Sequence, residues 1–251
     1  MKSISQIKQE LAHCNVETYD AFMKEYEADE RAGVIALLKK VKNQIKALEQ
    51  EQLRIEAMKK YEREYEMYQA ICGIDEVGRG PLAGPVVAGA VILPKDCGIL
   101  YLNDSKKLSE KKREELYVQI MKEAVATGIG VISHERIDEI NILNATYEAM
   151  RQAIGKLQVK PDILLNDAVT IPQVEIKQVP IIKGDAKSVS IAAASIIAKV
   201  TRDHMMMEYD EVYPGYGFAS NKGYGSQTHI EAIKKYGPTP IHRRTFITNF
   251  I

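Results

Sequence analysis

Carboxylates recur where apolar, β-branched runs of this chain end. The first run closes on Asp75 and Glu76, in "AICGIDEVGRG", and two later runs, "PDILLND" and "IKQVPIIKGD", close on Asp167 and Asp185. Ionised carboxylates are rarely buried without a partner, because removing the charge from water costs several kcal/mol. At a separation of about 4 Å, two of them repel by roughly 4 kcal/mol at an effective dielectric of 20. If these segments meet, the acids therefore need cations.

Mg²⁺ and Mn²⁺ suit a site built only of carboxylates, because hard divalent ions prefer oxygen ligands. Two such ions about 4 Å apart form the site used for in-line displacement at phosphorus. Taken singly, each acid could equally be a turn former or a helix cap. Successive strand residues point to opposite faces, so we expect the strand to bend or end at Asp75 and Glu76, as Gly78 permits.

The segments that must position these acids lie after residue 70, where strand-like and helix-like patterns alternate. This alternation indicates an α/β fold, a mixed sheet with helices packed against it. Strands are predicted at 71–78, 85–93, 128–134, 161–167 and 176–185. Helices are predicted at 108–126, capped by Ser109, and at 141–157, 188–213 and 226–237.

Residues 1–69 differ in texture, with one glycine and no proline, and predict an all-helical extension ahead of a catalytic domain at 70–251. Ser3 and Gln6 fit a capping box for the first helix. Further helices are expected at about 17–28 and 33–65, packing on their neighbours. Five basic residues occur without an intervening acid, namely Arg31, Lys39, Lys40, Lys42 and Lys46. They form either a solvated helix face or a phosphate-binding face that extends the footprint on a duplex.

Composition favours a globular protein of a reducing compartment. Hydrophobic residues make up 45% of the 251, and the formal net charge is zero, so nucleic-acid affinity must come from local patches. The three cysteines are isolated, and neither a signal peptide nor a membrane-spanning run is present. We therefore expect a cytoplasmic protein with no membrane partner. The glycines of "GRGPLAG" lack dinucleotide-site spacing and precede a strand, which disfavours a Rossmann site.

Long motifs, in order, resemble bacterial ribonuclease HII over residues 71–251. They read "GIDEVGRGPLAGPVVAGAVIL", "NDSKKLSEKKREELY", "KGDAKSVSIAAASIIAKVTRD" and "YPGYGFASNKGYGSQTHIEAIKKYGPTPIHRRTF". The resemblance implies an RNase H-like fold and an endonuclease that hydrolyses the RNA of RNA/DNA hybrids. It also implies cleavage 5′ to single ribonucleotides embedded in duplex DNA, as in ribonucleotide excision repair, with 3′-hydroxyl and 5′-phosphate ends. The "GRG" sequence favours this family over ribonuclease HIII, which usually has "GTG".

The resemblance also implies roles for individual residues. The catalytic residues and ligands of two Mn²⁺ or Mg²⁺ ions would be Asp75, Glu76, Asp167 and Asp185. The residues expected to bind substrate are Gly78, Arg79, Gly80, Lys106, Lys199, Arg202 and Tyr224. Gly78 to Gly80 would read the 2′-hydroxyl, the group that distinguishes RNA from DNA, since glycine lets a backbone approach closely.

Several alternatives stay open at this point. Tyr224, expected to sense the next sugar, could be a packing aromatic, and Lys199 and Arg202 could form a salt-bridged helix edge. His229 and His242 are expected to be structural. The chain could also be a non-catalytic junction-binding protein, or act like ribonuclease HIII on long hybrids only. The C-terminal "RRTFITNFI" has no glutamine at a sliding-clamp spacing, so no clamp motif is predicted, and we expect a monomer.

Overall fold

The computed structural model describes residues 2–251, which divide by their contacts into two compact units. The N-terminal unit extends to Glu56 and the larger unit covers Ala57–Ile251. The domain boundary predicted after residue 69 stays a prediction. No helix in the described part of the chain has the length and apolar character needed to cross a membrane.

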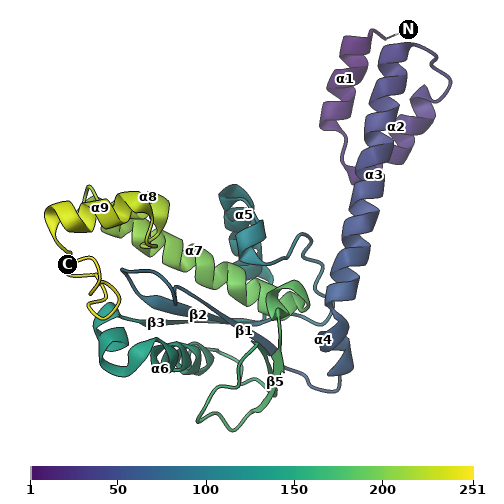
Figure 1. The fold of residues 1–251 in the computed structure, drawn as a ribbon. Coiled ribbons are helices and arrows are strands. Elements are labelled where there is room, and N and C mark those ends of the chain that lie inside the picture. The colour runs from purple at the N-terminus through teal and green to yellow at the C-terminus, as the bar shows by residue number, and fades with distance from the viewer. Residues whose placement is uncertain (1) are drawn as a thin grey trace. The chain divides into compact units, whose positions relative to one another are not determined.

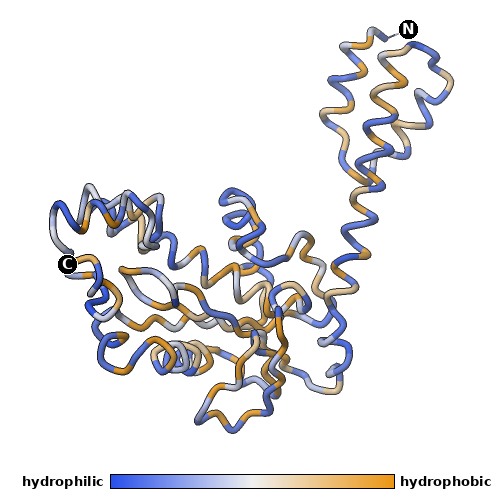
Figure 2. Tube along the Cα trace, in the orientation of Figure 1, coloured by the Kyte–Doolittle hydropathy of each residue, from blue (hydrophilic) through white to orange (hydrophobic). Residues whose placement is uncertain are grey.

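Three helices and a short 3₁₀ turn build the N-terminal unit (Figure 1). They are α1 (Ile4–His13), η1 (Val16–Thr18), α2 (Tyr19–Tyr26) and α3 (Ala32–Met58). The Ser3–Gln6 capping box is present as predicted. The unit's core consists of Ile7, Leu11, Phe22, Tyr26, Val34 and Val41. Hydrophobic and hydrophilic positions accordingly alternate along these helices in Figure 2, since each helix buries only one face.

A five-stranded mixed sheet forms the centre of the larger unit. Its strands are β1 (Ile71–Val77), β2 (Val86–Ile92), β3 (Ala126–Ile132), β4 (Ile163–Asp167) and β5 (Lys177–Ile181). They lie in the order β3-β2-β1-β4-β5, with β1 parallel to β4 and β4 parallel to β5, whereas β1, β2 and β3 pair antiparallel. The three strands that precede the acids are therefore neighbours, as the two-metal prediction requires.

Two long helices cover the two faces of the sheet, α6 (His134–Gly155) on one and α7 (Val189–Val212) on the other (Figure 1). A Cβ on Gly73 would lie 2.1 Å from the carbonyl carbon of Ser190, so α7 rests directly on β1. Because side chains alternate along a strand, Gly73 and Asp75 face α7, while Ile74 packs in the cluster on the α6 side.

The remaining helical elements surround this core. They are α4 (Lys60–Glu64), η2 (Ser105–Lys107), α5 (Glu110–Glu123), η3 (Gly184–Ala186), α8 (Phe218–Asn221) and α9 (Gln227–Tyr236). Ser109 caps α5 as predicted, by accepting a hydrogen bond from the backbone N–H of Lys112. The helix predicted at 141–157 begins seven residues earlier, at His134, and is interrupted where Asn141 takes a φ of 67°.

Two predictions about strand ends were wrong. The strand at Asp75 and Glu76 does not bend or end there, because β1 continues in register with β2 through Val77. The strand expected to end on Asp185 ends at Ile181, since Lys183 takes a left-handed φ of 58° and the chain then enters η3. Asp185 is thus carried by a short helical turn rather than by a strand.

Candidate active site

Asp75 and Asp167 lie side by side on adjacent parallel strands, Asp167 as the last residue of β4 and Asp75 two residues before the end of β1. Ile74 is in register with Asn166, so the next residue pair of the ladder is Asp75 and Asp167. Registered neighbours point to the same face, and both carboxylates therefore project on the side covered by α7. Because β1 and β4 are neighbours in the sheet, Asp75 and Asp167 lie close together although they are far apart in the sequence.

Asp185 extends this acidic group. Glu76 follows Asp75 on the continuing strand β1, so its side chain leaves the backbone toward the other face, and its charge interaction with Asp167 connects it to the group. The Asp167 carboxylate acts on the titration of Asp75, Glu76 and Asp185 alike, which shows that it lies within electrostatic range of all three. The loop that carries Asp185 is tied to Asp167 by the backbone N–H of Gly184, which donates to Oδ1 over 2.7 Å. Asp167 is therefore within electrostatic range of the other three predicted acids.

Burial raises the pKa of three of these carboxyls. The pKa of Asp75, which is 6% exposed, is well above its usual range because of burial and then the Glu76 charge. The pKa of Glu76 is also raised by burial, and Arg79 opposes the shift with its Nη1 3.4 Å from Glu76 Oε1. Burial, then Asp104 and Asp167, raises the pKa of Asp185. The protein holds these acids at an electrostatic disadvantage that a cation would relieve.

Two serine side chains, Ser195 and Ser105, lie between Asp75 and the loop before α5. Ser195 of α7 lies close enough to Asp75 to oppose the rise in the pKa of its carboxyl, and the Ser195 Oγ donates to that of Ser105 at 3.0 Å. The next residue, Lys106, is exposed, and its positive charge opposes the rise in the pKa of both Glu76 and Asp185. Lys106 therefore adds positive charge beside the acids, where its loop is fixed from beneath by two buried serines.

The donor set fits hard divalent cations. All four acids offer carboxylate oxygens, and among residues 2–251 only Glu76 has a cationic partner, Arg79, within ion-pair distance. Such oxygen ligands suit Mg²⁺ and Mn²⁺. Within residues 2–251, however, no three His, Cys, Asp or Glu side chains stand close enough together to hold an ion as they are placed. The residues fit the metal by chemistry and charge, and the spacing of their oxygens is wider than that of a closed ligand cage.

The predicted "GRG" segment forms a loop at the end of β1. Gly78 has a φ of +90°, and a Cβ there would lie 2.3 Å from Nε of Arg202, so only glycine fits this turn. Arg79 and Gly80 are exposed beside the acids. Tyr224 is 41% exposed, and its ring lies 3.9 Å from where a Cβ of Gly80 would stand. The loop and Tyr224 therefore form one surface adjacent to the carboxylates.

Two residues predicted to contact substrate are placed differently. The side chain of Arg202 is fully buried, and it donates to the backbone oxygens of Ala83, Pro85 and Lys222 at 3.2, 2.9 and 2.9 Å. Lys199 makes an ion pair of 2.7 Å with Asp203, and burial lowers the pKa of Lys199. Arg202 thus supports the loops from below, and the assignment of Arg202 and Lys199 to substrate binding stays a prediction.

Neither Arg243 nor Asp104 was singled out from the sequence. Asp104 acts on the site through its charge, which raises the pKa of Asp185. Arg243 is fully buried and donates to four backbone oxygens of the loop at 78–85. The sequence feature that could have identified Arg243 is the basic pair in "HRRTF", next to His242. That histidine is buried with His229, their Nε2 atoms 3.0 Å apart, and burial followed by His229 lowers the pKa of His242 to about 4. Both histidines occupy a packed interior.

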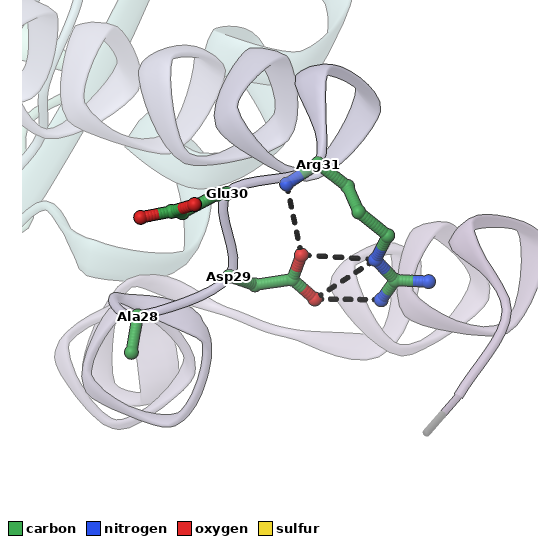
Figure 3. Close-up of a pocket in the computed structure, with 4 residues that line it drawn as sticks. All are labelled: Ala28, Asp29, Glu30 and Arg31. Carbon is green, nitrogen blue, oxygen red and sulfur yellow. Dashed lines mark hydrogen bonds and ion pairs between the residues drawn. The ribbon is translucent and has the colours of Figure 1, made fainter.

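A separate hollow lies in the N-terminal unit, lined by Ala28, Asp29, Glu30 and Arg31 (Figure 3). Arg31 donates hydrogen bonds to the Asp29 carboxylate from Nε and from Nη2, the latter over 2.6 Å. The backbone N–H of Arg31 also donates to this carboxylate. These charges satisfy each other at the start of α3. The hollow contains none of the predicted site residues, and it carries no candidate chemistry.

Comparisons with known proteins agree with this arrangement. The family model for ribonuclease HII matches residues 72–249, and the model for the ribonuclease HII N-terminal domain matches residues 3–66. A ribonuclease HII of Lachnoclostridium phytofermentans is 64% identical over 98% of this chain and 97% of the relative. One of Clostridioides difficile is 53% identical over 100% of this chain and 99% of the relative.

A solved structure shares the architecture. The ribonuclease H2 of Pyrococcus horikoshii OT3 is 31% identical, with a TM-score of 0.58, and the match covers 70% of this chain and 93% of that one. The mixed five-stranded sheet flanked by helices is thus RNase H-like, and it follows a helical N-terminal unit. From the family match and the near-complete alignment with its bacterial members, the chain belongs to the ribonuclease HII family.

Proposed function

We propose that Asp75, Glu76, Asp167 and Asp185 hold the metal ions with which this chain cleaves its substrate. As a member of the ribonuclease HII family, the chain is a metal-dependent endoribonuclease that cleaves the RNA of RNA/DNA hybrids and single ribonucleotides embedded in duplex DNA. The observation that carries the residue assignment is the parallel register of β1 and β4, whose last pair, Ile74 and Asn166, directly precedes Asp75 and Asp167.

The proposed mechanism assigns a task to each side chain. Two divalent ions, when bound, supply an activated water and neutralise charge on the leaving 3′ oxygen. The four carboxylates would hold these ions, and Asp75 is the most buried of them. Lys106 and Arg79 offer positive charge to the phosphates on either side. Cleavage 5′ to the ribonucleotide leaves a 3′-hydroxyl and a 5′-phosphate.

Recognition of the ribonucleotide is assigned to the surface formed by the Gly78–Gly80 loop and Tyr224. Arg79 and Gly80 are both exposed, and a Cβ on Gly80 would have only the Tyr224 ring within 4 Å among the described residues. The Tyr224 ring beside Gly80 offers a flat face for the adjacent deoxyribose. This juxtaposition supports a reader of the RNA-to-DNA junction, since the 2′-hydroxyl is the group that differs there.

The direct test is cleavage of three matched duplexes by the purified full-length chain with Mg²⁺ or Mn²⁺. One duplex is all DNA, one carries a single ribonucleotide, and one is a long RNA/DNA hybrid. We expect cleavage of the second and third only, with the single-ribonucleotide duplex cut on the 5′ side. Cutting of the long hybrid alone would favour action like that of ribonuclease HIII, and binding without cutting would favour a non-catalytic junction binder.

We also propose that the N-terminal unit grips the duplex through α3. Lys39, Lys42 and Lys46 follow one another at spacings of three and four, so they share one face of the helix, and all three are exposed. No ion pair to any of them is found among residues 2–251. Arg31, which belongs to the same basic run, is instead occupied by Asp29. The three lysines, here called the lysine stripe, are free for phosphates.

Replacing the stripe with Lys39→Gln, Lys42→Gln and Lys46→Gln is expected to weaken duplex binding at low salt. The slope of log K against log salt should become shallower by about one unit for each lysine that contacts a phosphate. Fluorescence anisotropy across a salt series measures both quantities. The matched control, Lys8→Gln, Lys24→Gln and Lys40→Gln, removes the same charge elsewhere in the unit. Equal slopes in the two triple variants would mean that the stripe is only a solvated face.

A further inference from the structure

Two arginines are buried beneath the loop at 78–85 without an acidic partner. Arg202 and Arg243 are both 0% exposed, and no ion pair to either is found within the described residues. Burial lowers the pKa of each, and for Arg243 burial and the nearby Arg202 charge bring the pKa to about 9. A buried charge without such compensation is destabilising, so both must be held by strong hydrogen bonds.

Arg243 finds these bonds at the two ends of the loop. Its Nη2 donates to Gly78 O at 2.6 Å and to Pro85 O at 3.1 Å, its Nη1 to Arg79 O at 3.0 Å, and its Nε to Gly84 O at 2.9 Å. One guanidinium thus joins the start and the end of the loop. It does so from the C-terminal segment, 165 residues after Gly78.

The direction of these bonds orients the opposite side of the loop. In a trans peptide the N–H points away from the C=O, and the chain has no cis peptide bond. Because Gly78 O and Arg79 O point down at Arg243, the N–H groups of Arg79 and Gly80 point up, away from the interior. Both residues are exposed, and no backbone acceptor for either N–H is found among residues 2–251.

We propose that Arg243 is a positioning residue for ribonucleotide recognition: it sets the N–H groups of Arg79 and Gly80 as paired donors toward a substrate oxygen. The inference rests on the proposed function and extends it to a side chain that never touches substrate. A guanidinium on the carbonyl end also polarises each peptide, which strengthens the donor at its other end. The oxygen that fits two such donors is the ribose 2′-oxygen or the adjoining phosphate.

The geometry requires arginine rather than any cation. Guanidinium presents five donors in a rigid planar fork, whereas the lysine ammonium has three donors on a flexible stem. Arg243→Lys therefore keeps the positive charge and loses the simultaneous contacts with Gly78 O and Arg79 O. The neighbouring Arg244 is exposed, and its side chain makes no contact with this loop that is found in the structure, so Arg244→Lys is the matched control.

The test compares the wild-type chain, Arg243→Lys and Arg244→Lys on the single-ribonucleotide duplex and on the all-DNA duplex. We expect Arg243→Lys to lower kcat/KM for the first by about 100-fold, the size of effect seen when one preorganised donor is lost. Affinity for the all-DNA duplex and the Mn²⁺ concentration for half-maximal activity should stay within about twofold. Arg244→Lys should match the wild type. Cleavage by Arg243→Lys within about threefold of wild type, or a loss explained by its folded fraction from circular dichroism, would overturn the proposal.

A second measurement decides the matter if Arg243→Lys does not fold. In Asp75→Asn, which should bind without cutting, NMR solvent exchange reports the amides of Arg79 and Gly80. Both should exchange rapidly in the free protein and become protected by the single-ribonucleotide duplex but not by the all-DNA duplex. Protection in the free protein, or equal protection by both duplexes, contradicts the assigned orientation. Failure of the wild type to cut would instead contradict the proposed function, and the exchange data would still test the donors.

Discussion

Asp75→Asn is expected to abolish cleavage, with kcat falling at least about 1,000-fold, while duplex binding persists. Asp75 is the most buried of the four acids and lies beside Asp167. Asparagine keeps the size and the acceptor oxygen for Ser195 and for the Glu76 N–H, and removes only the charge that a metal needs. Single-turnover cleavage and anisotropy on the same ribonucleotide duplex separate the two effects. Turnover near the wild-type rate would reject this site.

The same substitution should make the metal-free protein more stable. The folded-state pKa of Asp75 is raised by burial and by Glu76, so the folded protein binds its proton more tightly than the unfolded chain does. The charged form of Asp75 therefore destabilises the folded protein. This loss of stability is absent at low pH and appears as the pH rises through the raised pKa. At pH 8 with EDTA, Asp75→Asn removes this loss. We expect thermal melts to show a higher Tm than the wild type, with each 1 kcal/mol gained raising Tm by roughly 2–4 °C for this chain length.

Asp29→Asn is the control for the sign of this effect. The Asp29 pKa is lowered, chiefly by its side-chain hydrogen bonds with Arg31, so its charged form is favoured in the folded protein. Neutralising it should not raise Tm, and cleavage should be unaffected. A Tm for Asp75→Asn at or below that of the wild type in EDTA would mean that the acids are not held at an electrostatic disadvantage.

Removal of divalent ions is the second large effect expected. EDTA should reduce cleavage to background, and readdition of Mg²⁺ or Mn²⁺ should restore it. Saturating ion should also raise Tm, since a ligand at 100 times its Kd adds about 2.7 kcal/mol to the stability of the folded state. Asp75→Asn and Asp167→Asn should lose most of this gain. Thermal melts across an ion titration provide the measurement, and Asp29→Asn again serves as the unaffected control.

The ion requirement should depend on pH in a defined direction. The pKa values of Asp75, Glu76 and Asp185 are raised, so protons compete with the metal as pH falls toward them. The ion concentration for half-maximal activity should therefore rise as pH falls, by about tenfold per pH unit for each proton displaced. Activity at a fixed, subsaturating ion concentration should drop first. An ion requirement that stays constant between pH 8 and pH 5.5 would contradict the assignment of these carboxylates as ligands.

Local features of the chain were predictable because they depend on neighbours in the sequence. The Ser3–Gln6 capping box and the Ser109 cap follow from side chains that bond backbone groups three residues away. The strands before the acids follow from β-branched runs. The acids at the ends of three runs indicated only that a metal site would require these strands to be neighbours, and the structure places β1, β4 and β5 side by side.

The strand ends and the buried arginines were decided by tertiary contacts. β1 continues past Glu76 because β2 pairs with it through Val77, although Gly78 permits an earlier end. Arg202 shares the helical spacing of a solvated basic residue, yet the loops around Pro85 and Lys222 close over it. Sequence spacing on a helix cannot reveal such loops, because they come from distant segments.

The amino-acid sequence by itself thus determined the family and most of the helical and strand segments, whereas the assignment of the four acids to one site stays a prediction. The tertiary structure alone decided how the loop at 78–85 is held. Arg243 lies 165 residues after Gly78 in the sequence and binds the loop through backbone oxygens, which no side chain identifies in the sequence. A carbonyl acceptor is present at every residue, so no pattern of residue types marks those that a buried guanidinium will bind. Only the folded chain selects them.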